Sequence, residues 1–143
     1  MNYQYQLIPS ENIHDILPLL QLLNEGLDKT IILQRLDEMI VRGYKCLGVY
    51  DGEKIIGICG IWILTKIYAG RHIEPDNVTI HPDYRNKGIG EKMMEWVDNY
   101  AIANGCIAAE LNAYVSNEKG HRFWMNNGYK ILGFHFQKSL KTN

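Results

Sequence analysis

Residues 78–103 constrain the fold of this chain more than any other part of its sequence. Three β-branched residues, Val78, Thr79 and Ile80, are followed by a proline turn, a loop that contains Gly88 and Gly90, and an amphipathic run. This order predicts a strand, a turn and a helix whose first backbone N–H groups have no partners within the helix. Because the helix dipole adds partial positive charge at the same point, the pattern indicates a site for a phosphate group.

Two common phosphate loops do not fit this sequence. A nucleotide P-loop requires Lys and then Ser or Thr after its last glycine, but Gly90 is followed by Glu91. A dinucleotide loop requires a third glycine three residues further on, where this chain has Met93. The remaining pattern is Arg-x-x-Gly-x-Gly, which begins at Arg85. Its structural alternative is a tight strand-to-helix turn that binds no ligand.

A second motif lies near the C-terminus, in residues 117–129. It starts with Asn117, continues through the aromatic pair Phe123-Trp124 and ends with Gly128-Tyr129. In their order and separation, the two motifs resemble the signatures of the GNAT superfamily of N-acetyltransferases. The resemblance covers residues 44–140 well and the first 43 residues in outline. It implies a single acetyltransferase domain over residues 1–143.

Hydrophobic periodicity and turn residues predict the element order β-α-α-β-β-β-α-β-α-β-β. Ser10 can cap a first helix that ends near Gly26, and Pro18 should kink that helix or delay its start. Asp28 can cap a second helix that stops at Gly43. The fold class is therefore α/β (α+β), with a GNAT-like, mixed but mostly antiparallel sheet of about seven strands and helices on both faces.

The later elements follow from the same patterns. Strands are expected at residues 44–50 and 54–64, joined by an Asp51-Gly52 hairpin turn, and Gly57 and Gly60 indicate a bulge in the second of them. Further along, the sequence predicts a helix up to residue 103, a strand at residues 106–115, a short helix at residues 117–127 and a final strand pair up to residue 140.

Composition and charge exclude several classes of function. The chain has 143 residues, of which 46% are hydrophobic and 22% charged. Its formal net charge of −1 provides no overall electrostatic attraction to nucleic acid or to an anionic membrane. Its three widely spaced cysteines indicate reduced core residues and no disulfide frame or metal site. Residues 1–7 are polar and alternating, unlike a signal peptide or a membrane span, so a cytoplasmic location is expected.

The resemblance implies that acetyl-CoA is the acyl donor. The strand before the loop would offer an open edge to the amide-rich pantetheine arm, and the loop amides would take the pyrophosphate. Asn117 matches a cofactor-contacting Asn of the family, although a plain helix cap explains it equally well. The residues assigned to acetyl-CoA are Val78, Thr79, Ile80, Arg85, Asn86, Lys87, Gly88, Ile89, Gly90, Asn117 and Trp124.

Two carboxylates are candidates for the base that deprotonates an ammonium acceptor. Glu74 and Asp76 precede the loop, and their spacing of two places them on one side of an extended chain. Glu74 lies eleven residues before Arg85, as in several family members with a catalytic glutamate. Both carboxylates could instead face solvent. His72 and His81 could do the same work, although a lone histidine is more often a surface or hydrogen-bonded residue.

The general acid is unassigned. Many family members have an aromatic residue followed by Tyr where this chain has Phe123-Trp124, and an indole N–H is a poor proton donor. Trp124 is therefore expected to pack against pantetheine. Tyr129 belongs to a Gly-Tyr turn that is usually structural. Water can serve instead, because a thiol with a pKa near 8.5 is a tolerable leaving group.

Two functions from different classes remain open on this sequence. The first is acetyl-CoA-dependent N-acetylation of a primary amine, in a small molecule or a peptide, by direct attack on the thioester. The second is a catalytically silent acyl-CoA-binding or regulatory module on the same scaffold. The sequence identifies neither the acceptor nor the length of the acyl group, and it leaves a homodimer open.

Overall fold

The computed structural model describes residues 2–141 and divides into two compact units, Met1–Leu111 and Asn112–Asn143. In its described residues, 112–141, the second unit contains one helix, α4 (Glu118–Asn126). The first unit contains all the strands assigned in the described residues. Its elements, in chain order, are β1 (Gln4–Leu7), the 3-10 helix η1 (Ser10–Ile16), α1 (Leu17–Leu23), α2 (Lys29–Val41), β2 (Lys45–Asp51), β3 (Lys54–Lys66), β4 (Gly70–Ile80), the 3-10 helix η2 (Pro82–Tyr84), α3 (Ile89–Ala103) and β5 (Ala108–Ala109).

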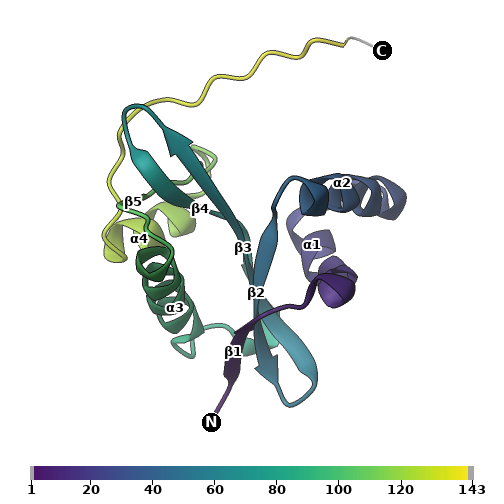
Figure 1. Ribbon diagram of the computed structural model, residues 1–143. Coiled ribbons are helices and arrows are strands. Elements are labelled where there is room, and N and C mark those ends of the chain that lie inside the picture. The colour runs from purple at the N-terminus through teal and green to yellow at the C-terminus, as the bar shows by residue number, and fades with distance from the viewer. Residues whose placement is uncertain (1, 142–143) are drawn as a thin grey trace. The chain divides into compact units, whose positions relative to one another are not determined.

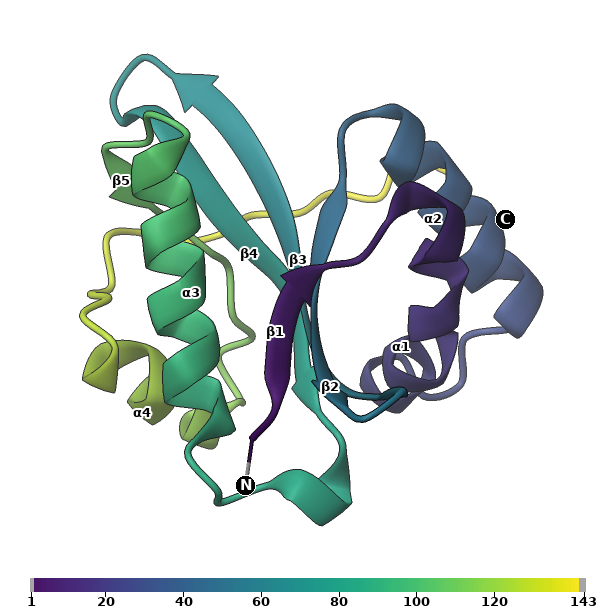
Figure 2. The same ribbon diagram turned by 60° about the horizontal axis from the view of Figure 1, so that its bottom comes forward.

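The first unit is built around one mixed sheet with the strand order β1-β2-β3-β4-β5. The first four strands pair antiparallel with their neighbours, whereas β5 pairs parallel to β4 through His72↔Ala108 and Ile73↔Ala109. Helices α1 and α2 lie on one face of the sheet and α3 on the other (Figure 1, Figure 2). The expected α/β class with helices on both faces is confirmed, and so is the mostly antiparallel pairing.

Local chemistry explains where the first helices begin and end. Pro18 lies in the first turn of α1, so the α-helix starts late, after a 3-10 turn, as the sequence predicts. The Asp28 carboxylate accepts a hydrogen bond from the Thr30 N–H at the start of α2. After α2, Gly43 has φ 104°, a left-handed conformation that favours glycine. The prediction for Ser10 was wrong: η1 follows Pro9 and has no side-chain cap.

The α1–α2 side of the sheet carries a continuous apolar core. Side chains from η1, α1 and α2 pack onto alternate residues of β2 and β3, because alternate strand residues share one face. The buried members are Ile8, Ile13, Ile16, Leu19, Leu20, Ile32, Leu36, Tyr44, Cys46 and Ile58.

The strand count and the C-terminal strands require correction. The sheet has five strands, not about seven, and the strand expected at residues 106–115 is reduced to Ala108–Ala109. Two hydrogen bonds mark the ends of its pairing with β4. At the first end the Ile107 N–H donates to the Arg71 carbonyl, and at the last the Glu110 N–H donates to the Ile73 carbonyl. The next rung would need an N–H on Pro75, which proline lacks. This explains why β5 ends there.

The expected final strand pair up to residue 140 is also wrong. Residues 130–141 contain no assigned strand in the described part of the chain. Their apolar side chains, among them Ile131, Phe134 and Phe136, are exposed. Alternation along a segment indicates that it could be a strand, but a strand forms only where another backbone supplies the ladder.

Gly60 permits a close approach of β3 to β4. The register of this pair shifts between Ile58 and Gly60, so the bulge predicted from the glycines is confirmed. A Cβ on Gly60 would lie 2.6 Å from the Asp76 carbonyl oxygen and 2.6 Å from the Tyr44 ring. Only glycine therefore fits this position without movement of the neighbouring backbone.

We expect Gly60→Ala to lower the free energy of unfolding by roughly 1–3 kcal/mol, the usual cost of overpacking a core. Gly57→Ala is the matched control, because its closest contact would be the flexible end of Met93, at 3.3 Å. Urea denaturation of both variants measures the difference. Equal free energies of unfolding for the two variants would show that β4 can move at the bulge without loss of stability, and would contradict this prediction.

Candidate functional site

The loop between β4 and α3 presents a series of free backbone donors. Helix α3 begins after Gly88 and has no side-chain cap. Asn86 and Gly88 have φ values of 62° and 77°, and this left-handed geometry turns the chain into the helix. Within the described residues, no hydrogen bond is made by the backbone N–H groups of residues 86–91. A helix N-terminus with uncapped amides is a binding site for an anion.

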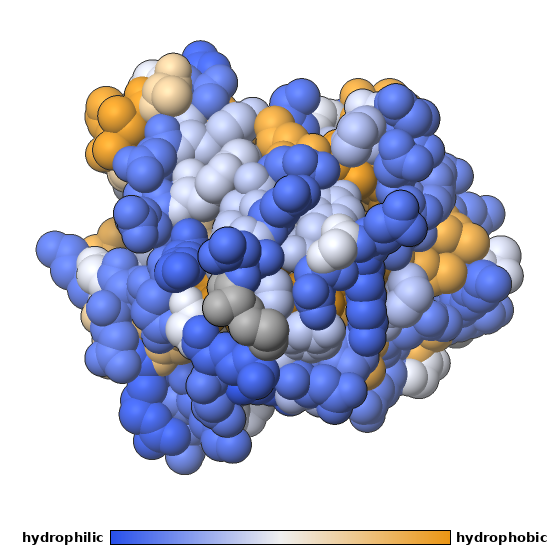
Figure 3. Space-filling model, turned by 90° about the horizontal axis from the view of Figure 1, so that it is seen from below, coloured by the Kyte–Doolittle hydropathy of each residue, from blue (hydrophilic) through white to orange (hydrophobic). Residues whose placement is uncertain are grey.

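The side chains around this loop add charge and anchorage. Arg85, Lys87 and Lys92 are exposed. The Arg85 Nε donates to the Ile80 carbonyl over 3.1 Å, which aligns the guanidinium along the loop. The Tyr84 hydroxyl donates to the Asp51 carboxylate over 2.6 Å, so the β2–β3 turn holds the start of the loop. Hydrophilic side chains dominate the surface seen from this end of the molecule (Figure 3).

Strand β4 leaves one edge open next to the loop. It pairs with β5 only at His72 and Ile73, whereas its pairing with β3 continues to Ile80. Within the described residues, no strand covers the other edge of residues 76–80. Unpaired strand groups of this kind can bind an extended, amide-bearing ligand as an added strand. Val78, Thr79 and Ile80, predicted as edge residues, are therefore on the open segment.

Glu74 and Asp76 lie on the α1–α2 face of β4, close to the bulge. Asp76 accepts a hydrogen bond from the Trp62 indole N–H over 3.0 Å. The Glu74 side chain is 19% exposed, and its Oε2 lies 2.8 Å from the His72 Nε2 and 3.6 Å from the Lys66 Nζ. Glu74 is therefore partly accessible and is held by two basic side chains, whereas Asp76 is engaged with an indole.

His72 is fully buried beneath this carboxylate. Its Nδ1 lies 3.0 Å from the Gly70 carbonyl oxygen, and its Nε2 lies 3.9 Å from the Glu110 Oε1 in addition to the contact with Glu74. Burial alone lowers the pKa of His72, but the bonds to Gly70 and Glu74 and the charge of Glu110 outweigh it and raise the pKa.

The sequence did not identify Glu110 as part of this cluster. It reaches His72 only because the short β5 runs parallel to β4, and the length and register of that pairing leave no local signal. The Tyr68 hydroxyl, from the β3–β4 turn, donates to Glu110 over 2.5 Å. The ligand atoms of His72, Glu74 and Glu110 lie within 4.8 Å of one another, a spacing that a divalent cation could also use.

The other two predicted cofactor residues belong to the second unit. Asn117 caps α4, since its Oδ1 accepts from the Gly120 N–H over 3.0 Å. This confirms the helix-cap interpretation, and a contact with the cofactor stays a prediction. Trp124 packs edge-on against Phe123 and Tyr129, with ring centroids 5.0 and 5.3 Å away.

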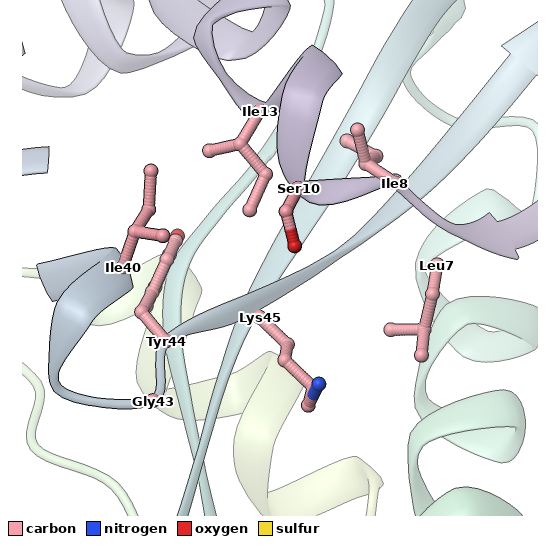
Figure 4. A pocket seen from close by; sticks show the side chains of 8 residues that line it. All are labelled: Leu7, Ile8, Ser10, Ile13, Ile40, Gly43, Tyr44 and Lys45. Atoms are coloured by element: carbon pink, nitrogen blue, oxygen red, sulfur yellow. The ribbon is translucent and has the colours of Figure 1, made fainter. Parts of the chain in front are cut away.

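A small cavity of about 120 Å³ lies on the α1–α2 side of the first unit (Figure 4). Mostly apolar side chains from β1, η1, α2 and β2 surround it. None of the predicted site residues is among those that line it. They are Leu7, Ile8, Ser10, Ile13, Ile40, Gly43, Tyr44 and Lys45.

Comparison with known proteins identifies the family. Residues 14–129 match the acetyltransferase (GNAT) family. The match covers most of the chain, and the chain therefore belongs to this family.

Named relatives agree with this assignment. The aminoalkylphosphonate N-acetyltransferase of Salmonella typhimurium is 26% identical over 66% of this chain and 61% of that protein. The thialysine N-epsilon-acetyltransferase of Mus musculus is 28% identical over 60% of this chain and 48% of that protein. The chain thus spans between about half and three-fifths of the length of these curated relatives.

Structural similarity extends further along the chain. A crystal structure of a predicted acetyltransferase with acetyl-CoA, from Clostridium acetobutylicum, has a TM-score of 0.77 at 16% identity and covers 97% of each chain. At that identity the likeness shows the fold alone. No helix in the described residues is long and apolar enough to cross a membrane.

Proposed function

We propose that this protein transfers the acetyl group of acetyl-CoA to a primary amine of a small molecule or a peptide. The observation that carries the proposal is the juxtaposition, in one unit, of an uncapped phosphate-binding loop, an open strand edge and a partly exposed carboxylate. The residues that would bind acetyl-CoA are those predicted from the sequence, with Arg85 and the amides of residues 86–90 at the pyrophosphate. Residues 1–143 would form one acetyltransferase domain.

The chemistry needs a neutral amine and a polarised thioester. Glu74 is the proposed base, since it is partly exposed and lies on the same strand as the open edge. Asp76 is the second candidate, because it is two residues closer to the loop, although the Trp62 indole occupies one of its oxygens. The amine then attacks the thioester directly, and the departing CoA thiolate takes a proton from the amine nitrogen or from water.

The relatives support an amine as the acceptor. One is named for N-acetylation of an aminoalkylphosphonate and another for N-epsilon-acetylation of thialysine, so both names describe acetyl transfer to a nitrogen of an amine. The carboxylates of Glu74 and Glu110, which flank His72 in the first unit, would suit a cationic amine that must lose a proton. A cytoplasmic location is proposed as well, since the buried cysteines Cys46 and Cys59 are free thiols.

The proposal is tested by binding and turnover together. We expect acetyl-CoA to bind with micromolar affinity in calorimetry and to raise the melting temperature, because it binds only the native state. A panel of primary amines, assayed by release of the CoA thiol, should then yield at least one substrate. Binding without turnover on any amine would favour the silent acyl-CoA-binding module, and no binding at millimolar acetyl-CoA would contradict both.

Trp124 is proposed as an apolar wall for the pantetheine arm. Replacing it by Phe keeps most of the contact area, so we expect a small change in kcat. Trp124→Ala should chiefly raise the Michaelis constant for acetyl-CoA. Steady-state kinetics at saturating amine separates the two variants. A loss of more than about a hundredfold in kcat for a folded Trp124→Phe protein would mean that the indole N–H has a chemical task.

A further inference from the structure

His72 is surrounded by hydrogen-bond acceptors at both ring nitrogens. Its Nδ1 faces the Gly70 carbonyl at 3.0 Å, and its Nε2 faces the Glu74 carboxylate at 2.8 Å. A neutral imidazole carries only one N–H, so either tautomer would set a nitrogen lone pair against an oxygen. With Glu74 ionised, the doubly protonated ring donates at both nitrogens, whereas a neutral ring that carries its proton on Nδ1 can accept a proton from Glu74 at Nε2. The contact between Nε2 and Glu74 is therefore a place where one proton can pass between the two side chains.

The charges around the ring are fixed by three further groups. Glu110 adds a second carboxylate 3.9 Å from Nε2, and the Tyr68 hydroxyl donates to that carboxylate. The Lys66 Nζ, from β3, lies 3.6 Å from the same Glu74 oxygen, Oε2, that contacts His72. His72 is completely buried, whereas Glu74 is partly exposed. Glu74 lies within hydrogen-bond distance of Nε2 and Glu110 does not, so a proton on His72 can exchange with a bound molecule through Glu74.

We infer that His72 and Glu74 act together as the base of the acetyl transfer, with Glu74 touching the amine and His72 receiving the proton behind it. The inference rests on the proposed function. A free carboxylate, with a pKa near 4, is a weak base for an ammonium group, and an imidazole with a pKa near 6.5 is stronger by more than two units. Coupling the two lets an accessible carboxylate take a proton that a buried imidazole then stores.

The protons and bonds balance in this step. The pair starts with His72 neutral and Glu74 ionised. The acceptor ammonium gives one proton to the Glu74 Oε2, which passes it to the His72 Nε2. The amine lone pair forms the N–C bond to the thioester carbonyl, the C–S bond breaks, and the second nitrogen proton ends on the CoA thiolate. His72 finally returns its proton to water, so the reaction releases one proton for each ammonium consumed.

The inference predicts a specific pH dependence of kcat/KM. The rate should fall as the pH drops through the pKa of the His72–Glu74 pair, because the protonated pair cannot accept another proton. Glu110→Gln removes a negative charge that stabilises the imidazolium, so it should lower this pKa and move the acidic limb to lower pH. The amine's own ionisation affects every variant equally when one acceptor is used throughout.

The test combines imidazole NMR with these pH profiles. In protein labelled with ¹⁵N-histidine, His72 should titrate above the ordinary value of about 6.5, and its pKa should fall in Glu110→Gln. The kinetic limb should shift in the same direction. His72→Gln should lose about tenfold or more of kcat/KM at neutral pH and lose that limb. His14→Gln is the matched control, since His14 is exposed and pairs with Asp37 elsewhere in the unit.

Each outcome supports or overturns the inference. A folded His72→Gln protein with an unchanged pH profile would reduce His72 to a structural role. Loss of activity in EDTA that a divalent cation restores would mean that the cluster holds a metal, and the proton-storing pair would be wrong. If no amine is acetylated, the proposed function fails and the base role fails with it. The NMR titration, which needs no turnover, would then still report whether the proton is shared.

Discussion

Replacing Glu74 by glutamine is expected to lower kcat by about 10²–10⁴-fold, the usual contribution of a general base. Glutamine keeps the shape of the side chain but has no basicity at neutral pH, so the amine keeps its proton. Acetyl-CoA affinity should change little, because the loop and the open strand edge are untouched. Steady-state kinetics and calorimetry on the same preparation measure both quantities.

Two further variants make this result specific. Glu95→Gln changes an exposed carboxylate on α3 and should leave kcat unchanged. Asp76→Asn tests the second candidate on the same face of β4. If Glu74→Gln retains turnover and Asp76→Asn abolishes it, the base is Asp76, and the assignment of Glu74 is wrong.

Gly88→Val is expected to weaken acetyl-CoA binding by about tenfold or more, which corresponds to about 1.4 kcal/mol. Gly88 has φ 77°, a conformation that costs a side-chain-bearing residue roughly 1–2 kcal/mol. If the loop backbone changes conformation to relieve this strain, its N–H groups no longer point toward one and the same phosphate. The added Cβ itself meets no atom within 4 Å, so the fold should tolerate the change.

A matched glycine separates binding from stability. Gly26, after α1, has φ 85°, and a Cβ added there also meets no atom within 4 Å, so Gly26→Val carries a similar backbone strain away from the loop. Both variants should show a comparable loss of melting temperature, and only Gly88→Val should lose affinity for acetyl-CoA. Equal affinity in the two variants would contradict a phosphate site at this loop.

Much of the first unit could be predicted because its signals are local. The late start of α1 follows from Pro18, the start of α2 from Asp28 and the β3 bulge from Gly60, and each of these acts within a few residues. The strand–loop–helix motif was equally predictable, since the left-handed Gly88 and the uncapped helix follow from consecutive residues.

The rest depended on contacts between distant segments. The strand expected at residues 106–115 has the right composition, yet it ends early because Pro75, on the neighbouring strand, cannot continue the ladder. The cluster around His72 needs Glu110 from that same pairing, so no local pattern predicts it. Residues 130–141 alternate like a strand, but alternation does not supply a partner.

The most direct test of acetyl transfer by direct attack is mass spectrometry of one reaction mixture. The mixture contains the protein, acetyl-CoA and an amine that the protein accepts as a substrate. We expect one N-acetylated amine for each free CoA thiol, and a protein whose mass stays unchanged when the amine is left out, because the amine itself attacks the thioester. An acetylated protein that then transfers its acetyl group to the amine would contradict direct attack. Free CoA without any acetylated amine would contradict the acetyl transfer itself.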